Sequence, residues 1–192
     1  MSISKIRSLA IFLMAFGATF NAKAAADPTT YLIGCFDGGG AGTIPDEIGG
    51  HNGAFPVTLP KEATGSCLTI LGTSMGVSNS YSHATNNSAG KASVQNMNFS
   101  TYVGIASPAL FVASAASYKI DTFRLIQFQG SKLLEVIELK NVVITSLEAT
   151  GQDGNRFTQT FTLDFDRISY QVNPSGTNVK ATGWDLKTNT KI

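Results

Sequence analysis

The segment from Phe157 to Asp166 alternates between apolar and polar residues at nearly every step. Side chains of a β-strand point to opposite faces in turn, so this period predicts a strand with one buried face. The inner face would carry Phe157, Gln159, Phe161, Leu163 and Phe165, and the outer face Thr158, Thr160, Thr162, Asp164 and Asp166. From Ile168 onward the apolar set moves by one position, which predicts a bulge or a bend near residues 166–168.

Strand signals recur through the rest of the chain. Its 19 glycines and 12 phenylalanines, together with many Thr, Val and Ile residues, favour short strands joined by tight turns over a helical bundle. Residues 132–143 also permit a helix, but their β-branched content favours a strand. We expect further strands in residues 31–36, 67–77, 93–99, 123–128 and 133–147, with turns at 130–131 and 151–155.

One segment favours a helix. Ser107 and Pro108 supply an N-cap and a first-turn proline, and residues 109–116 follow with high helix propensity and no glycine or proline. The apolar side of this helix, which we expect to face the sheet, would consist of Leu110, Phe111 and Ala115.

Two stretches are predicted to be loops. Residues 38–65 contain many glycines and prolines and permit at most a brief extended piece at 54–59. Their glycine cluster at 38–42 lacks the lysine and the helix start of a phosphate-binding loop, so we interpret it as a flexible linker. Residues 78–90 are polar and expected to be mobile.

The first 26 residues have the pattern of a signal peptide. Lys5 and Arg7 precede an uncharged stretch, residues 9–20, which is too short to cross a hydrocarbon core of roughly 30 Å as a helix. Small residues then offer cleavage sites after Ala24 or after Ala26. An uncleaved anchor would need a longer apolar run, and no later stretch is apolar enough to span a membrane. We therefore predict a signal peptide at 1–26 and a single domain at 27–192.

Cys35 and Cys67 are the only cysteines in the chain. An exported protein meets an oxidising compartment, where paired thiols tend to be bridged. We predict a disulfide that ties together the two ends of the loop at 38–65, the alternative being two buried free thiols.

Charge and residue patterns exclude several functions. The 14 basic and 13 acidic residues leave a formal net charge of +1 without a basic cluster, so we expect no nucleic-acid partner. Asp164 and Asp166 would lie about 7 Å apart, a separation that inverting glycosidases use, but their threonine neighbours indicate a solvated face. His51 and His83 fall in loops without a second ligand at metal spacing, and no serine lies in a nucleophile elbow. We predict no catalytic, cofactor or metal site and no enzyme activity.

Several segments together resemble one protein family. In order they are AGKASVQNMNF at 89–99, SPAL opening the helix at 107–110, LKNVVITS at 139–146, FTLDF at 161–165 and GWDL at 183–186. This ordered set is similar to the Hcp family, the tube proteins of bacterial type VI secretion systems, over roughly residues 67–186. The resemblance implies a small two-sheet β-barrel with one short helix packed on its side, assembling as hexameric rings that stack into a tube.

The resemblance also bears on Trp184 and on export. It places Trp184 at the close of the last barrel strand, which favours packing over the alternative role of a binding anchor, and Asp185 would help to fix that strand's register. Tube proteins of this family normally lack a cleaved signal peptide. The predicted leader and the glycine-rich segment 38–65 therefore suggest an exported relative, periplasmic or secreted.

The leading functional hypothesis is a non-enzymatic, ring-forming structural protein whose main partner is itself. Secretion-system components or secreted cargo would be its further partners, with no membrane association after signal cleavage. Since the core uses most of the apolar sequence, we expect loops and strand edges, not an apolar patch, to hold such rings. The alternatives are a secreted effector and a monomeric periplasmic binding module that use the same barrel as a scaffold.

Overall fold

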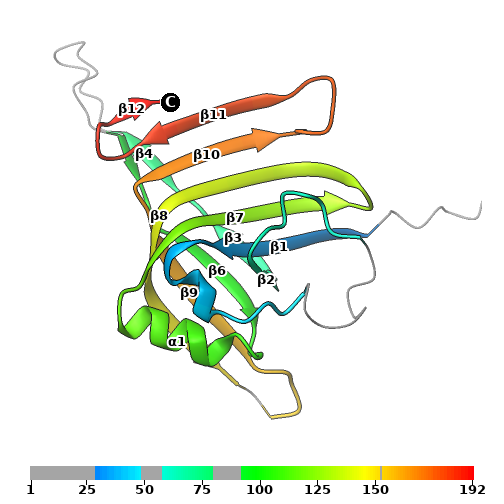
Figure 1. Cartoon of the computed structure of the whole chain (residues 1–192), viewed down its shortest axis with the longest axis vertical. Coiled ribbons are helices and arrows are strands. Elements are labelled where there is room, and N and C mark those ends of the chain that lie inside the picture. Colours follow the sequence, from blue (N-terminus) through cyan, green and yellow to red (C-terminus); the bar gives the residue numbers. More distant parts are fainter. Residues whose placement is uncertain (1–28, 49–57, 80–91, 152) are drawn as a thin grey trace, which may run out of the picture.

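A computed structural model describes residues 29–48, 58–79, 92–151 and 153–192. These residues form antiparallel strands, one α-helix and one 3-10 helix (Figure 1), so the mainly β class predicted from the sequence is confirmed. The elements in chain order are β1 (Thr30–Asp37), η1 (Gly39–Thr43), β2 (Ser66–Thr69), β3 (Gly72–Ser74), β4 (Val77–Asn79), β5 (Ala92–Val94), β6 (Met97–Tyr102), α1 (Ser107–Ala115), β7 (Lys119–Gln129), β8 (Lys132–Thr150), β9 (Thr158–Asp164), β10 (Arg167–Val172), β11 (Lys180–Asp185) and β12 (Thr190–Lys191).

The strands form one large, curled sheet and one small one. The 10-stranded sheet runs in the order β12-β11-β10-β8-β7-β1-β2, and β8 also pairs with β9, which continues through β6 to β3. The strand β2 pairs with β1 at one end of the sheet, and the next strand, β3, pairs with β6 at the other. The short segment from β2 to β3 therefore brings these two ends of the sheet together. The result is a barrel-like body from which β10, β11 and β12 extend (Figure 1). The second sheet is the β4–β5 pair.

The predicted strands are present, with two of them divided. Residues 133–147 lie in the long strand β8, which pairs with β7 across the turn at Gly130. The expected strand at 67–77 consists instead of β2, β3 and the start of β4, because the chain leaves β1 to join β6. The expected strand at 93–99 is shared between β5 and β6. Residues 78–79 belong to β4, not to a loop, and the rest of that predicted loop lies outside the described residues.

Phenylalanine side chains fill the barrel. Phe36, Phe99, Phe123 and Phe161 come from four different strands, and each is at most 1% exposed. The ring centroids of Phe99 and Phe161 lie 5.3 Å apart and those of Phe36 and Phe123 lie 4.8 Å apart. This cluster binds β1, β6, β7 and β9 into one body, and most of the predicted inner face of β9 is buried within it or beside it.

Phe157 is the exception on that face, because its side chain is 57% exposed. It precedes β9 in the β8–β9 connection, which projects beyond the barrel below α1 in Figure 1. The prediction that Phe157 points into the core is therefore wrong. The apolar and polar residues already alternate at Phe157, although the barrel does not cover this position.

The predicted bend near residues 166–168 is present, and β8 bends with it. After Phe165 the next buried residue is Ile168, and in β8 the next buried residue after Leu139 is Val142. Each step is three residues instead of two, so the buried set shifts by one position in both strands. Asn141 in β8 takes a positive φ of 53° at this point. Since both strands shift together, the sheet turns from the barrel wall into the β10–β11 extension without losing its pairing.

An ion pair joins β10 to β11. Arg167 Nε donates to Asp185 Oδ2 at 2.7 Å, and the two residues are direct cross-strand partners. Asp185 is buried, and its other oxygen accepts the Thr188 backbone N–H at 2.9 Å. That bond and the Arg167 guanidinium hold the pKa of Asp185 below its usual value. Asp185 therefore ties the end of β11 to the start of β10 and to the turn that follows.

We expect the variant Asp185→Asn to unfold at a lower temperature than the parent protein near neutral pH. A carboxyl group whose pKa is lower in the folded state contributes stability above its unfolded pKa of about 3.9 and loses it as the pH falls through the folded value. The difference between variant and parent should therefore shrink below about pH 4 in thermal unfolding followed by circular dichroism. Asp153→Asn, in an exposed turn, is the control and should match the parent. A difference that is independent of pH would contradict the ion-pair explanation.

Candidate assembly surface

Cys35 and Cys67 form a disulfide across β1 and β2. The two residues are direct cross-strand partners with Cα atoms 4.0 Å apart. Both are buried in a second apolar cluster with Ile33, Ile48 and Ile126. The bridge joins the two ends of segment 38–65, as predicted.

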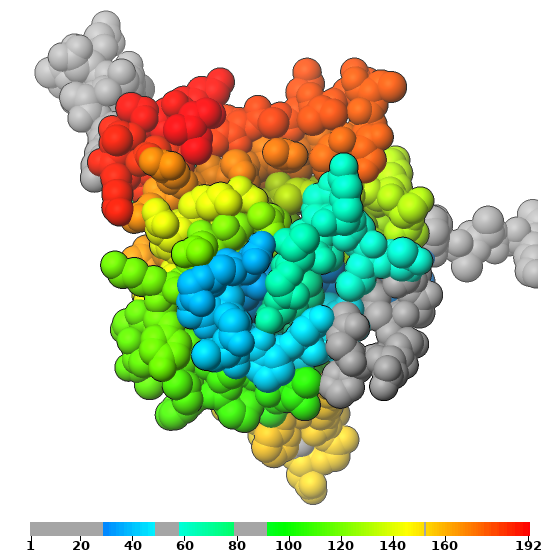
Figure 2. Space-filling model, viewed as in Figure 1, coloured from blue at the N-terminus to red at the C-terminus, as the bar shows by residue number. Residues whose placement is uncertain are grey.

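The glycines at 38–42 are not a flexible linker, in contrast to the interpretation from the sequence. Residues Gly39–Thr43 form η1, which lies against the start of β7. Gly39 has a φ of +54°, and a Cβ atom there would lie 2.5 Å from the Lys119 carbonyl oxygen. Glycine is therefore required for close backbone packing. Figure 2 shows η1 and β2 side by side on one face of the molecule.

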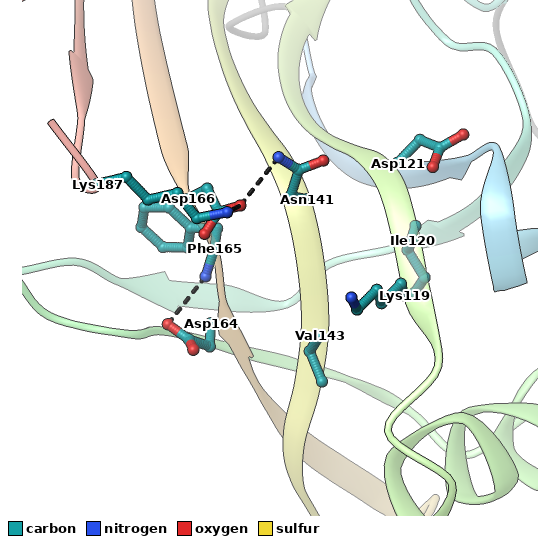
Figure 3. Close-up of a pocket in the computed structure, with 9 residues that line it drawn as sticks. All are labelled: Lys119, Ile120, Asp121, Asn141, Val143, Asp164, Phe165, Asp166 and Lys187. Carbon is teal, nitrogen blue, oxygen red and sulfur yellow. Dashed lines mark hydrogen bonds and ion pairs between the residues drawn. The ribbon is translucent and has the colours of Figure 1, made fainter.

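Asp164 and Asp166 line a cleft of about 400 Å³ at the bend between β9 and β10 (Figure 3). Lys187 contacts Asp166 at 2.6 Å, and Asn141 Nδ2 donates to the same carboxylate at 2.9 Å. Asp164 accepts the Phe165 backbone N–H at 3.0 Å. The two carboxylates thus share one cleft, but Asp166 is paired with a cation and Asp164 is exposed. These contacts are those of a polar surface cleft.

A network of charged side chains covers the outer face of β1, β7 and β8. Arg124 contacts Glu138 at 2.8 Å and Asp37 at 3.2 Å, and Lys140 contacts Glu138 at 3.1 Å. Burial by itself would raise the pKa of Glu138, but the bonds from Lys140 and Arg124 hold it below its usual value. Each of these charges has an opposite charge beside it, so the network presents little net charge to a partner.

The helix α1 exposes an apolar face. Leu110 and Ala113 are fully buried against the barrel, whereas Phe111 is 64% and Val112 48% exposed. The predicted inner face is therefore right for Leu110 and wrong for Phe111 and Ala115, which face outward. Nor is Ser107 the N-cap: the cap residue is Ala106, and Ser107 Oγ instead accepts the Gly104 N–H at 2.9 Å.

Exposed apolar side chains also occur outside the helix. The segment from Leu71 to Val77 leaves three large apolar side chains at the surface, namely Leu71, Met75 and Val77. The expectation that the core would use up the apolar sequence is therefore wrong.

Trp184 lies at the margin of the core. Its side chain is half-buried and packs against the main apolar cluster, which agrees with the packing role. Its indole Nε1 is buried and has no hydrogen-bond partner within the described parts of the chain.

The remaining candidate residues lie outside the described residues. They are the proposed cleavage positions Ala24 and Ala26 and the histidines His51 and His83. In the described ranges no group of three or more His, Cys, Asp or Glu residues is placed to hold a metal ion. No helix within these ranges combines the length and hydropathy needed to span a membrane.

Solved structures share this fold. Hcp1 from Salmonella typhimurium superposes with a TM-score of 0.65 at 16% identity, covering 85% of this chain and 99% of that one. A type VI secretion system effector from Yersinia pestis gives 0.60 at 18% identity, covering 80% and 98%. At such low identity these similarities establish the fold alone. No curated protein matches the sequence significantly.

The family model described as "Type VI secretion system effector, Hcp" matches residues 64–172. The matched region begins just before β2 and ends with β10, and it includes α1 and most of the barrel. It excludes β1 and η1, and with them the glycines at 38–42. Because the match covers more than half of the chain, the protein belongs to the Hcp family of type VI secretion proteins.

Proposed function

We propose that this protein is a non-enzymatic structural subunit that assembles into hexameric rings and acts as a tube or carrier component of type VI secretion. The match of residues 64–172 to the Hcp family carries this proposal. The fold supports it further, because the solved structure of Hcp1 from Salmonella typhimurium shares this β-barrel with one helix on its side. Its principal partner would be a second copy of itself, with secretion-system components or cargo as further partners.

The exposed face of α1 is the contact that we assign to the ring. A ring needs a heterologous contact, in which two different surfaces of each subunit meet. The sequence SPALFVASA of α1 is apolar on nearly all sides, and helices of this kind are normally covered. Phe111 is the most exposed large side chain of this helix, so it would be the anchor that a neighbouring subunit buries.

Light scattering tests the assembly. We expect purified protein without its leader to show six times the subunit mass at high concentration and smaller species on dilution. Phe111→Ser should shift this transition to about tenfold higher concentration or more, since an anchor aromatic residue contributes over 1 kcal/mol to an interface. A strict monomer at all accessible concentrations would overturn the ring and favour a monomeric binding module.

The matched control is Val179→Ser. Val179 is 47% exposed and lies just before β11, away from α1. Both variants should keep the thermal midpoint of the parent subunit, because neither side chain belongs to the core. If Val179→Ser disrupts the rings as strongly as Phe111→Ser does, α1 is not the contact.

We further propose that the leader is removed on export and that the mature protein is periplasmic or secreted. When the full chain is expressed in a bacterium, the exported protein should begin at Ala25 or Asp27. Intact-mass measurement of periplasmic and medium fractions would identify the first residue. A chain that starts at Met1 and stays in the cytoplasm would contradict this proposal.

A further inference from the structure

The start of α1 is held by a carboxylate from a distant part of the chain. The helix supplies no such group itself, because its N-cap residue, Ala106, makes no side-chain capping bond and its first turn contains no acidic residue. Instead, Glu47 Oε1 accepts the Ala106 backbone N–H at 2.9 Å. A Cβ atom at Gly104 would overlap the same oxygen, so the carboxylate lies directly against the backbone that enters the helix. A negative charge in this position stabilises a helix.

Glu47 is in turn bonded to β2, the strand that carries one half of the disulfide. The Glu47 backbone N–H donates to the Cys67 carbonyl oxygen at 2.9 Å. Asp46 Oδ1 accepts the Cys67 N–H at 3.2 Å and the Ile48 N–H at 3.0 Å. Ile48 is buried in the same apolar cluster as Cys35 and Cys67. The position of Glu47 therefore depends on the position of Cys67, which the disulfide fixes to β1.

We propose that the disulfide between Cys35 and Cys67 regulates the assembly face of α1 through Glu47, which acts as a positioning residue. The bridge keeps β2, a strand of four residues at the end of the sheet, on β1. Glu47 then holds the start of the helix that presents Phe111. Without the bridge, β2 and Glu47 leave these positions more often, and a surface that is competent only part of the time binds with an affinity reduced by that fraction. This inference rests on the proposed function, in which α1 forms the ring contact.

Formation of the bridge requires an oxidant, which here is the disulfide of a thiol–disulfide carrier. As the S–S bond of the protein forms, the two cysteine thiols give up two protons and two electrons, which convert the carrier disulfide into two thiols. Cys35 and Cys67 are 0% and 2% exposed in the folded protein, so the exchange has to precede the closing of the segment over them. The redox state is therefore set where the chain folds: reduced in a thiol-rich cytoplasm and oxidised after export. Assembly before export is thereby disfavoured.

Hydrogen exchange in dilute protein measures this coupling without rings. The Leu110 N–H donates to the Ala106 carbonyl oxygen at 2.9 Å and reports on the first turn of α1. Its exchange should be at least about threefold faster in the reduced parent and in oxidised Glu47→Ala than in the oxidised parent. The Leu186 N–H, which donates to the Asp166 carbonyl oxygen at 2.8 Å, is the control and should respond less. An unchanged Leu110 rate, or equal acceleration of Leu186, would overturn the proposal.

Light scattering then tests the effect on assembly. In oxidised protein, Glu47→Ala should move ring formation to at least about threefold higher concentration. Glu47→Gln keeps the acceptor oxygen and should stay closer to the parent. In reduced protein, Glu47→Ala should have little further effect, because the carboxylate has already left the helix. Equal shifts by this substitution in both redox states would overturn the coupling.

The two measurements separate this inference from the proposed function. If no protein forms rings but Leu110 responds as expected, the ring proposal is overturned and the link from the disulfide to α1 is supported. If rings form and Leu110 exchange is independent of the bridge, the regulation is overturned and the rings stand. If the reduced parent does not refold, oxidised Asp46→Ala replaces it, since this variant breaks the bond to Cys67 but keeps the bridge and Glu47. It should accelerate Leu110 exchange as Glu47→Ala does, and an unchanged rate would count against the proposal.

Discussion

Replacing Phe161 by alanine should destabilise the subunit by roughly 3 to 5 kcal/mol. The Phe161 side chain is fully buried and contacts the Phe99 ring at a centroid distance of 5.3 Å. Its centroid also lies 6.0 Å from that of Phe36 and 6.4 Å from that of Phe123. Removing the ring therefore opens a cavity at the junction of four strands, where the surrounding barrel cannot collapse freely. Denaturant unfolding followed by circular dichroism would measure the change in free energy.

Phe157→Ala is the matched control for this prediction. It makes the same substitution four positions earlier, at a side chain that is 57% exposed. Exposed substitutions of this kind usually change the free energy of unfolding by no more than about 0.5 kcal/mol. Equal losses for the two variants would show that the buried face of β9 is not the one described above. Domain stabilities are commonly 5 to 15 kcal/mol, so we expect Phe161→Ala to lower the yield of folded protein as well.

Removing the disulfide should have a comparable effect. Cys35 and Cys67 are 32 residues apart, and the loop entropy that such a bridge removes from the unfolded chain corresponds to roughly 3 to 4 kcal/mol. The double variant Cys35→Ala and Cys67→Ala should lose this amount, together with the packing of two buried sulfur atoms. Its denaturant dependence should also steepen, because the unfolded chain expands without the bridge.

The control for the disulfide is the parent protein unfolded and refolded in the presence of a thiol reductant. It retains both sulfur atoms but lacks the bridge. Reduced parent and double variant should have similar stabilities, well below that of the oxidised parent. If the oxidised and reduced proteins are equally stable, the bridge does not constrain the unfolded chain, and segment 38–65 is held by η1 and its packing alone.

The disulfide and the inner face of β9 could be predicted because neither requires knowing how distant elements pack. Two cysteines allow one intramolecular pairing, and a period of two residues specifies a strand wherever one face is covered. The candidate surfaces were harder to predict from the sequence. Phe111 and Leu110 are adjacent and both apolar, so helix propensity does not decide which of them meets the barrel. The rotation of α1 about its axis is set by the shape of the surface that Leu110 and Ala113 enter.

The sequence by itself determined the β class, the presence and approximate position of α1, the long strand through residues 133–147 and the shift in phase near residues 166–168. Only the tertiary structure decided where coverage of a strand ends, as for Phe157, and which elements meet, as for the β4–β5 pair and Trp184, which line one groove. It also revealed that Asn141 shifts the phase of β8 to match β10, and that the glycines at 38–42 pack against β7. The physical reason is that alternation, propensity and turn residues act on neighbours along the chain. Burial, by contrast, depends on residues that are distant in sequence and brought together by strand pairing.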